Sequence, residues 1–297
     1  MLRTRIAPTP SGFLHIGNGF SFLLTYLICR KHRGSLLLRI DDADSERKRP
    51  EYIEDIFESL KWLGITWNEG PLNADDFEKN WSQINRRSDY MNMLSELAAS
   101  GNVFACECSR KKLESFKDLK RYPDICTSLR IPFDQPETAW RIHVPEDKII
   151  HIDDVFAGAV DYPLGKDPGS FIVRKRDGEA AYQVSSLSDD LKYNINFIVR
   201  GEDLLSSTAS QLYLAEMLNR KAFQQIRFLH HPLQKDDNGN KLSKSAGSVS
   251  LQYMRKHGFK PADVYRLFCE QLLGIQAQPQ SMDELAMTFE QSSHPFA

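Results

Sequence analysis

The segment RIAPTPSGFLHIGN (5–18) contains residues that could bind a nucleotide. His15 and Gly17 come just after an apolar start, and a helical pattern follows them. Glycine at the beginning of a helix lets a phosphate approach the backbone amides, and an imidazole can add a hydrogen-bond donor. The segment therefore predicts a phosphate-binding turn, which the four residues 15–18 cannot prove by themselves.

A second segment, KLSKS (241–245), places Lys241 and Lys244 on either side of a serine and follows the turn-forming run DDNGN. Lysines on a loop can bring positive charge to a polyphosphate during nucleotidyl transfer and withdraw it afterwards. For this segment alone, a solvated surface loop is the alternative. Because both segments occur in one chain, we expect them to form one ATP site.

Three cysteines, Cys106, Cys108 and Cys126, stand near one another in the sequence, whereas Cys29 and Cys269 stand alone. Thiolates favour zinc, and three of them with one further ligand make a closed tetrahedral site. For a C-x-C pair alone, buried structural cysteines are the alternative. Few cysteines in an odd number also fit a reducing compartment better than a disulfide framework, so we expect a cytoplasmic protein.

The composition predicts a folded protein that does not enter a membrane. The chain has 297 residues, of which 41% are hydrophobic, and no stretch approaches the ~20 apolar residues of a membrane span. The formal net charge is -2, so contact with nucleic acid would need a local basic face. A solvated helix face is the alternative for the one basic stretch, which contains Arg110, Lys111, Lys112, Lys117, Lys120 and Arg121.

The elements that must position these residues alternate between strand and helix near both ends of the chain. Such alternation predicts a parallel α/β unit. Ser206 or Ser207 is available as the N-cap of one helix. The expected helices cover 19–34, 49–64 and 206–219, and the expected strands lie within 35–40, 195–203 and 226–232.

The middle of the chain has a different character. Short strand signals run from about 104 to 190, including 139–145 and 169–186, and the latter has a hairpin turn at Asp177-Gly178. This pattern predicts a lobe inserted into one α/β domain. Beyond the lysine segment we expect helices around 251–258 and 261–274, followed by polar residues. The predicted parts are the first half of the α/β domain (1–100), the inserted lobe (101–190), the second half with KLSKS (191–246) and a short helical region (247–297).

Four longer segments, RIAPTPSGFLHIGN, LRIDDADSER, LKWLGITWNEGP and FIVRGEDLLSSTASQ, agree in order and spacing with one family. Together with KLSKS, they resemble the class I aminoacyl-tRNA synthetases, and within that family the glutamyl branch. The resemblance covers most of the chain up to about residue 250. It implies a Rossmann-like parallel sheet, an inserted zinc-containing lobe that binds the acceptor, and no anticodon-binding domain after the short helical region.

The resemblance also implies roles for individual residues. His15, Gly17, Lys241 and Lys244 would bind ATP, with His15 and the two lysines as catalytic residues. No nucleophilic side chain is needed, because the carboxylate of glutamate attacks the α-phosphate, and Mg²⁺ would bridge the departing pyrophosphate. The glutamate site would consist of Arg5, Ala7, Thr9, Asp41, Tyr182 and Arg200.

These residue types suit an amino acid with an acidic side chain, because each carboxylate needs a cation and the ammonium group needs an anion. For Arg200, a salt bridge with Glu202 or Asp203 is the alternative. For Asp41, the alternative is a role as a helix cap or as a loop carboxylate. The family generally has glutamate in place of Asp41, so the shorter side chain would need a water bridge or a shifted ligand.

The cysteine spacing is similar to that of one subgroup of the family, the glutamyl-Q tRNA(Asp) synthetases, in which a tyrosine is the fourth zinc ligand. By this resemblance, one structural Zn²⁺ would be held by Cys106, Cys108, Tyr122 and Cys126. Water, Asp124 or Glu107 are the alternatives to Tyr122. The subgroup also tends to lose the second histidine of the nucleotide signature, and Asn18 takes that position here.

The resemblance therefore implies an adenylate-forming ligase that activates glutamate with ATP and transfers it to queuosine in the anticodon of tRNA(Asp). One alternative is a shortened synthetase-like enzyme that glutamylates a tRNA 3′ end or a non-tRNA acceptor. Another is a catalytically silent module that binds tRNA or a protein. The expected partners are glutamate, ATP and tRNA(Asp), with no membrane, and the expected oligomeric state is a monomer.

Overall fold

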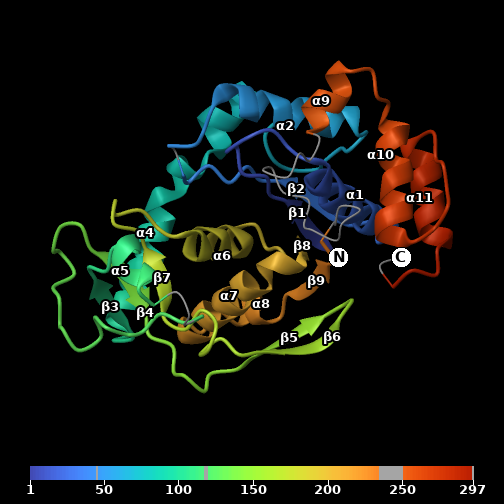
Figure 1. The fold of residues 1–297 in the computed structure, drawn as a ribbon. Coiled ribbons are helices and arrows are strands. Elements are labelled where there is room, and N and C mark those ends of the chain that lie inside the picture. Colours follow the sequence, from blue (N-terminus) through green and yellow to red (C-terminus); the bar gives the residue numbers. More distant parts are fainter. Residues whose placement is uncertain (45, 117–119, 234–249, 296–297) are drawn as a thin grey trace.

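Parallel strands from residues 3–38 and 197–231 form the centre of the molecule (Figure 1). The structure is a computed structural model, and it describes residues 1–44, 46–116, 120–233 and 250–295. The backbone N–H of Asn196 donates to the carbonyl of Arg3 at 3.0 Å, which makes the first and second parallel pairs neighbours. The first pair is β1 (Arg3–Ile6) with β2 (Ser35–Leu38), and the second is β8 (Phe197–Gly201) with β9 (Arg227–His231). The expected α/β class with a parallel sheet is therefore confirmed.

Two helices near the N-terminus cover this sheet. Helix α1 (Ile16–Lys31) contacts β1, β2 and β8, and most of its apolar residues are fully buried, Phe20 among them. Helix α2 (Pro50–Trp62) begins at a proline, which has no N–H to lose at the first helical position. Both helices and β2 confirm the sequence-based expectation, with ends that differ by a few residues.

Helix α7 (Leu205–Met217) connects β8 to β9, but its N-cap differs from the prediction. A single 3₁₀ turn, η3 (Glu202–Leu204), follows β8 directly, and the N-cap of α7 is Leu204. Ser206 and Ser207 therefore lie inside the first turn, and the predicted serine cap was wrong. The 3₁₀ turn is the physical reason, because it brings the backbone into helical geometry before the serines are reached. A short helix, α8 (Lys221–Gln224), precedes β9.

The middle of the chain contains a separate antiparallel sheet, at the left of Figure 1. It has the order β3 (Val103–Cys106), β4 (Ala139–Ile142) and β7 (Phe171–Arg174), and helix α5 (Arg110–Glu114) follows β3. Another hairpin, β5 (Ile150–Asp154) and β6 (Gly158–Tyr162), joins the edge of β9 instead, through Asp154 opposite Phe228. The range 101–190 thus contributes to two sheets, and its boundaries as one inserted lobe remain a prediction.

The predicted turn at Asp177-Gly178 is present, but the second strand of that hairpin is not. Gly178 has φ +90°, and a single bridge joins Ala180 to Arg174. The chain then enters helix α6 (Tyr182–Lys192). The alternating residues YQVSS suggested a strand, whereas Val184 and Leu187 continue at helical spacing and are fully buried.

The remaining helices fall in two segments of the chain. The connection from α2 to β3 contains α3 (Ala74–Asp76), a π-helix η1 (Phe77–Trp81), a 3₁₀ helix η2 (Gln83–Arg86) and α4 (Arg87–Ala99). The C-terminal region contains α9 (Leu251–Lys256), α10 (Pro261–Phe268), a π-helix η5 (Cys269–Leu273) and α11 (Met282–Gln291).

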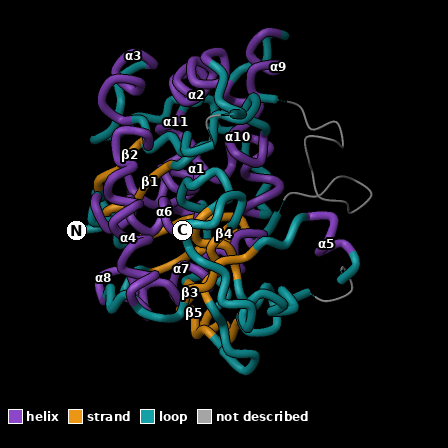
Figure 2. Tube along the Cα trace, turned by 90° about the vertical axis from the view of Figure 1, so that its left-hand side faces the viewer, coloured by secondary structure: helices purple, strands orange, loops and turns teal. Residues whose placement is uncertain are grey.

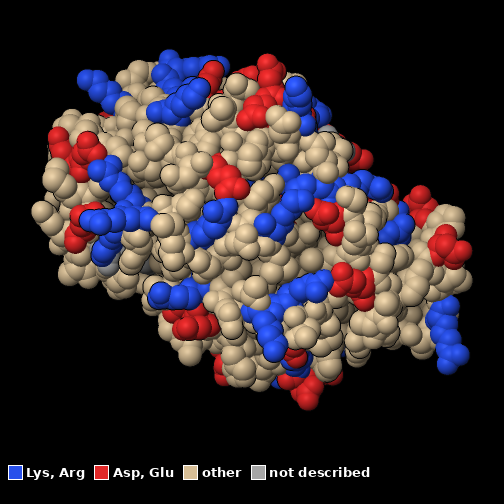
Figure 3. All heavy atoms as spheres, turned by 180° about the vertical axis from the view of Figure 1, so that it is seen from behind, with Lys and Arg blue, Asp and Glu red and all other residues tan. Residues whose placement is uncertain are grey.

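The C-terminal helices lie at the end of the molecule opposite β3 (Figures 1 and 2), and α10 and α11 contact α1. The sequence did not predict α11, because its polar residues conceal the buried Leu285 and Phe289. Within the described ranges, no helix is both long and apolar enough to cross a membrane. Figure 3 shows basic and acidic residues interspersed over one face, as the net charge of -2 suggests.

Candidate active site and metal cluster

The first predicted signature forms the N-terminus of α1. His15 is the N-cap, and its Nδ1 accepts a hydrogen bond from the backbone N–H of Asn18 at 3.3 Å. In return, Oδ1 of Asn18 accepts from the backbone N–H of His15 at 3.1 Å. This reciprocal capping box gives Asn18 a structural role in the turn. A Cβ on Gly17 would lie 3.1 Å from the His15 ring, so a side chain there would press on the imidazole.

The second signature lies outside the described residues, and so do Lys241 and Lys244. The residues that flank it can be placed. Ser250 forms an antiparallel bridge with His15, and the backbone N–H of Leu251 donates to the carbonyl of Leu14 at 2.8 Å. On the other side, Nε2 of His231 contacts the hydroxyl of Ser21 on α1. Both flanks of the lysine segment therefore lie beside the first half of α1.

Three of the six predicted glutamate-binding residues line one cavity. Thr9, Asp41 and Tyr182 line one cavity of about 270 Å³, whose wall also includes Gln83 and Lys175. Tyr182 is the first residue of α6, and Thr9 follows β1 along the chain. The cavity therefore lies between the first strand pair and α6.

Arg5 and Arg200 meet at a carboxylate of α6 that the sequence did not suggest. Nε of Arg5 donates to Oδ1 of Asp190 at 3.1 Å, and Nη2 of Arg200 forms an ion pair with Oδ2 of the same residue at 3.9 Å. All three side chains are buried. The ion pair of Arg200 is thus with Asp190, rather than with the suggested Glu202. Neither Arg5 nor Arg200 is among the residues that line the cavity of Thr9, Asp41 and Tyr182. Ala7, between Arg5 and Thr9 on the same segment, is not among them either.

Arg39 is a second residue that the sequence did not single out. Its Nε and Nη2 donate to the two carboxylate oxygens of Asp41 at 2.6 and 2.9 Å, and its Nη1 donates to Asp190 at 2.8 Å. Asp41 therefore does not cap a helix; it lies in the loop after β2, as the alternative suggested, and is paired with Arg39. The available signal was an arginine at the end of the apolar run SLLLRI, where a buried charge requires a partner.

Burial and ion pairing have opposite effects on these groups. Burial raises the pKa of Asp41, and Arg39 opposes that shift without cancelling it. Burial lowers the pKa of Arg39, but Asp41, Asp190 and Asp189 outweigh it, and the pKa lies well above its ordinary value. Burial also lowers the pKa of Arg5, although Asp190 favours its charged form. Arg39 is thus firmly held in its charged state.

Asp189, next to Asp190 on α6, anchors the helix to the connection that precedes α4. Arg86 donates to both of its oxygens at 2.8 and 2.9 Å, and Tyr90 and Gln83 each donate at 2.9 Å. Burial raises the pKa of Asp189, but Arg86 and the other donors outweigh it and leave the pKa below its ordinary value. Asp189 is therefore satisfied by protein groups.

Arg200 makes a hydrogen bond on one side, and on the other side it has the longer ion pair with Asp190 at 3.9 Å. Its Nη1 donates to the hydroxyl of Thr208 at 3.0 Å. Among the described residues, Nε and Nη2 have no hydrogen-bond partner, and both atoms are buried. These two donors form one edge of the guanidinium group, whose spacing matches the two oxygens of a carboxylate. Arg200 can therefore accept a carboxylate side-on.

The predicted metal ligands form a buried cluster. The sulfur atoms of Cys106, Cys108 and Cys126 all lie within 4.8 Å of one another, and the last two are 3.4 Å apart. The hydroxyl of Tyr122 lies 3.3 Å from Sγ of Cys106 and 3.5 Å from Sγ of Cys108. Asp124 is engaged by Ser170 and Arg121. The donors present fit a tetrahedral site for a thiophilic ion such as zinc.

Neighbouring groups and burial shift the pKa values of the residues in the metal cluster. Burial raises the pKa of Cys106, but hydrogen bonds from Tyr122 and other neighbours outweigh it, and the pKa lies below its ordinary value. Burial raises the pKa of Cys108 to about 11 and also raises that of Tyr122. The guanidinium of Arg141 stacks 3.9 Å from the centre of the Tyr122 ring. A bound cation would have to displace the remaining protons.

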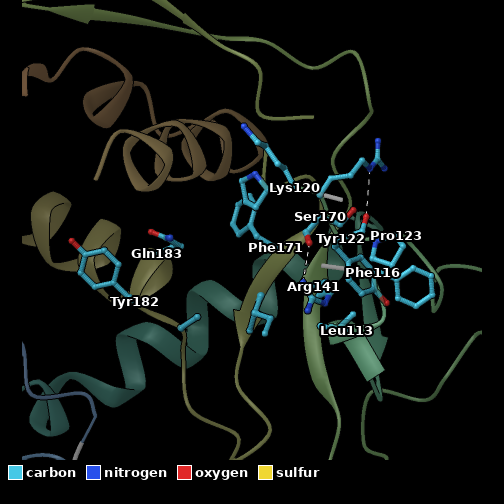
Figure 4. Close-up of a pocket in the computed structure, with 14 residues that line it drawn as sticks. Leu113, Phe116, Lys120, Tyr122, Pro123, Arg141, Ser170, Phe171, Tyr182 and Gln183 are labelled. Carbon is cyan, nitrogen blue, oxygen red and sulfur yellow. Dashed lines mark hydrogen bonds between the residues drawn. The ribbon is translucent and has the colours of Figure 1, made fainter. Parts of the chain in front are cut away.

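A larger cavity, of about 470 Å³, lies between the cluster and the glutamate cavity (Figure 4). Tyr122 and Arg141 lie on one side of it, and Tyr182 and Gln183 on α6 lie on the other. Tyr182 lines both cavities. The two spaces are therefore adjacent.

The fold defines the class of protein. The chain resembles a glutamate-tRNA synthetase from Elizabethkingia anophelis, with a TM-score of 0.79 over 96% of this chain and 65% of that chain, at 23% identity. This likeness is to the class I synthetase fold. Residues 1–293 match the family of class I tRNA synthetases (E and Q), catalytic domain, and the chain belongs to this family. It is an ATP-dependent ligase of the synthetase type.

Two relatives refine this comparison. A glutamyl-Q tRNA(Asp) synthetase from Nitratidesulfovibrio vulgaris is 35% identical over 89% of this chain and 84% of its own length. A glutamate–tRNA ligase from Hydrogenobaculum sp. is 32% identical over 94% of this chain but only 59% of its own length. The chain thus spans most of the first relative and little more than half of the second. The resemblance to the glutamyl-Q tRNA(Asp) synthetases is confirmed.

Proposed function

We propose that this protein activates glutamate with ATP and transfers it to queuosine in the anticodon of tRNA(Asp). The observation that carries the proposal is the buried charge cluster at the glutamate cavity. Arg5, Arg39 and Arg200 face Asp41 and Asp190, which leaves one positive charge in excess, because Asp189 pairs with Arg86. Glutamate carries one negative charge overall and glutamine none, so the cluster favours glutamate.

In the activation step, the α-carboxylate of glutamate attacks the α-phosphorus of ATP. The bond from that phosphorus to the bridging oxygen breaks, and pyrophosphate leaves with Mg²⁺, which supplies positive charge to the leaving group. His15 and Gly17 would bind the nucleotide at the N-terminus of α1. Lys241 and Lys244 would stabilise the phosphates, since their segment is flanked by residues that contact α1.

Glutamate would bind in the cavity lined by Thr9, Asp41 and Tyr182. The edge of Arg200 that has no hydrogen-bond partner among the described residues would take one carboxylate side-on, and Arg5 would contribute a second cation. Asp41 would stabilise the ammonium group while it remains paired with Arg39. Ala7, on the same segment as Thr9, would contribute its backbone atoms to the glutamate site.

The acceptor nucleoside would enter through the larger cavity. Tyr182 and Phe171 offer aromatic faces on which a base can stack, and Lys120 and Arg121 offer positive charge to its phosphates. A structural Zn²⁺ held by the four ligands of the metal cluster would fix Tyr122, which forms part of the cavity wall. The range 101–190 would then act as the acceptor-binding lobe, and a monomer would suffice.

The test combines pyrophosphate exchange with transfer of labelled glutamate. We expect glutamate-dependent exchange, followed by incorporation into tRNA(Asp) that contains queuosine but not into tRNA(Asp) with guanine at that position. Removal of the 3′-terminal adenosine should leave incorporation unchanged. If incorporation requires that adenosine, the enzyme is a shortened synthetase that charges 3′ ends. If no amino acid supports exchange, with or without tRNA, the chain is a silent binding module.

A further inference from the structure

A chain of buried polar groups leads from β5 to Arg200. Oδ2 of Asp154 lies 2.7 Å from Nδ1 of His230, and Nε2 of His230 lies 2.8 Å from the hydroxyl of Thr208. That hydroxyl accepts from Nη1 of Arg200 at 3.0 Å. All four side chains are at most 5% exposed. They come from four elements, β5, β9, α7 and β8, which the chain of contacts joins.

The carboxylate at one end sets the direction of these hydrogen bonds. Burial raises the pKa of Asp154, but His230 and the backbone N–H groups of Ala157 and Phe156 outweigh it, so the pKa lies below its ordinary value. The ionised Asp154 accepts from Nδ1 of His230. The hydroxyl proton of Thr208 has two acceptors within reach, Nε2 of His230 at 2.8 Å and the carbonyl of Leu204 at 3.2 Å, and the oxygen of Thr208 accepts from the guanidinium of Arg200.

Thr208 contacts only one of the three nitrogens of Arg200. It fixes Nη1, and it leaves Nε and Nη2 as the edge without a hydrogen-bond partner among the described residues. Without the hydroxyl, the guanidinium could turn and pair more closely with Asp190, whose Oδ2 is also buried and without a hydrogen-bond partner there. That rotation would close the carboxylate-binding edge.

We propose that Thr208, His230 and Asp154 are positioning residues that hold Arg200 open for a carboxylate of the amino acid. This inference rests on the proposed function, in which Arg200 binds glutamate. It assigns the amino-acid affinity in part to β5 and β9, whose residues line none of the glutamate cavity. A purely structural role, in which these contacts only join α7 to β9, would lower stability without a selective effect on glutamate.

The experiment uses Thr208→Val in the full chain, because valine keeps the shape and removes the hydroxyl. The matched control is Thr25→Val in α1, where a buried threonine hydroxyl donates to the carbonyl of Ser21 at 2.7 Å. Thr208→Ser restores the hydroxyl. Thr208→Ala and Thr25→Ala form a second pair of variant and control, in which the smaller alanine side chain cannot overpack the site. The measurements are KM for glutamate and for ATP in pyrophosphate exchange, and the melting temperature with and without glutamate.

We expect Thr208→Val to raise KM for glutamate about tenfold while KM for ATP stays within about twofold, since a lost hydrogen bond to a charged group has this size. Thr208→Ser should return to near the wild-type value, and Thr25→Val should change neither KM. If Thr208→Val and Thr208→Ala lower the melting temperature but leave KM for glutamate unchanged, the proposal is overturned. Absence of exchange in the wild-type protein would instead overturn the proposed function.

Discussion

At the scale of residues, the proposed amino-acid site depends on the buried charge cluster. Arg5 and Arg200 could be assigned by resemblance, and the structure brings them to one carboxylate. That carboxylate, Asp190, and its partner Arg39 were not predicted, because residue type does not reveal which charges are buried together. Only the folded chain decides that Asp41 pairs with Arg39.

Arg39→Gln should be strongly destabilising, because it leaves Asp41 without its bidentate partner and removes one of the cations from Asp190. Loss of one member of a buried ion pair costs about 3–5 kcal/mol. Urea denaturation followed by circular dichroism measures the free energy of unfolding. Arg47→Gln is the control, since the side chain of Arg47 is 71% exposed and its nearest carboxylate oxygen, in Asp44, lies 3.7 Å away. Equal stability of the two variants would contradict the prediction.

At the scale of elements, the N-terminus of α1 and the metal cluster were the features most accessible from the sequence. Glycine and histidine before an apolar helix indicated the helix start, and three neighbouring cysteines indicated the cluster. Helix α6 was missed in part because its first residues alternate like a strand, and α11 because its exposed face is polar. Local periodicity is ambiguous over five or six residues, and tertiary packing decides such cases.

Gly17→Ala should impair nucleotide binding while α1 remains stable. The new Cβ would lie 3.1 Å from the His15 ring, whereas alanine otherwise favours a helix over glycine by about 1 kcal/mol. We expect KM for ATP to rise about tenfold in pyrophosphate exchange. Gly19→Ala is the matched control in the same helix, because its Cβ would meet the flexible end of Leu251 at 3.4 Å. A similar loss in both variants would point to helix damage instead.

Tyr122→Phe should weaken zinc binding at least about tenfold, because it removes the one oxygen donor from the cluster of three thiols. Zinc content by mass spectrometry and competition with a chelator measure the change. Cys269→Ser is the control. That cysteine is buried and distant in sequence from the cluster, so the variant should keep the zinc content of the wild type. Undiminished affinity in Tyr122→Phe would favour water as the fourth ligand.

At the scale of the whole molecule, residues from both halves of the chain hold the site together. Asp190 on α6 pairs with Arg5 on β1, with Arg39 directly after β2, and with Arg200 on β8. Asp189 ties the same helix to Arg86. Loss of either carboxylate should therefore affect global stability and the glutamate cavity together.

Asp189→Asn should reduce the free energy of unfolding by about 3–5 kcal/mol at neutral pH. Because the folded pKa of Asp189 lies below its ordinary value of 3.8, its stabilising effect is complete above that value and is lost as the pH falls through the folded pKa. The difference between wild type and Asp189→Asn should thus shrink below about pH 3.8. Asp153→Asn, at an exposed position on β5, should differ from wild type by less than about 0.5 kcal/mol at each pH. A difference for Asp189→Asn that does not depend on pH would contradict this assignment.

The shared carboxylate of Asp190 has a consequence for how amino-acid selectivity can change. Three arginines share it, and together with Asp41 they leave one positive charge in excess. Neutralisation of one arginine would therefore balance the buried charges and remove the preference for an amino acid with a net negative charge. A variant that accepts glutamine would therefore be expected to change Arg5 or Arg200, because Arg39 is also the bidentate partner of Asp41. A library that randomises Asp190 together with its arginines would test whether this charge balance sets the selectivity proposed above.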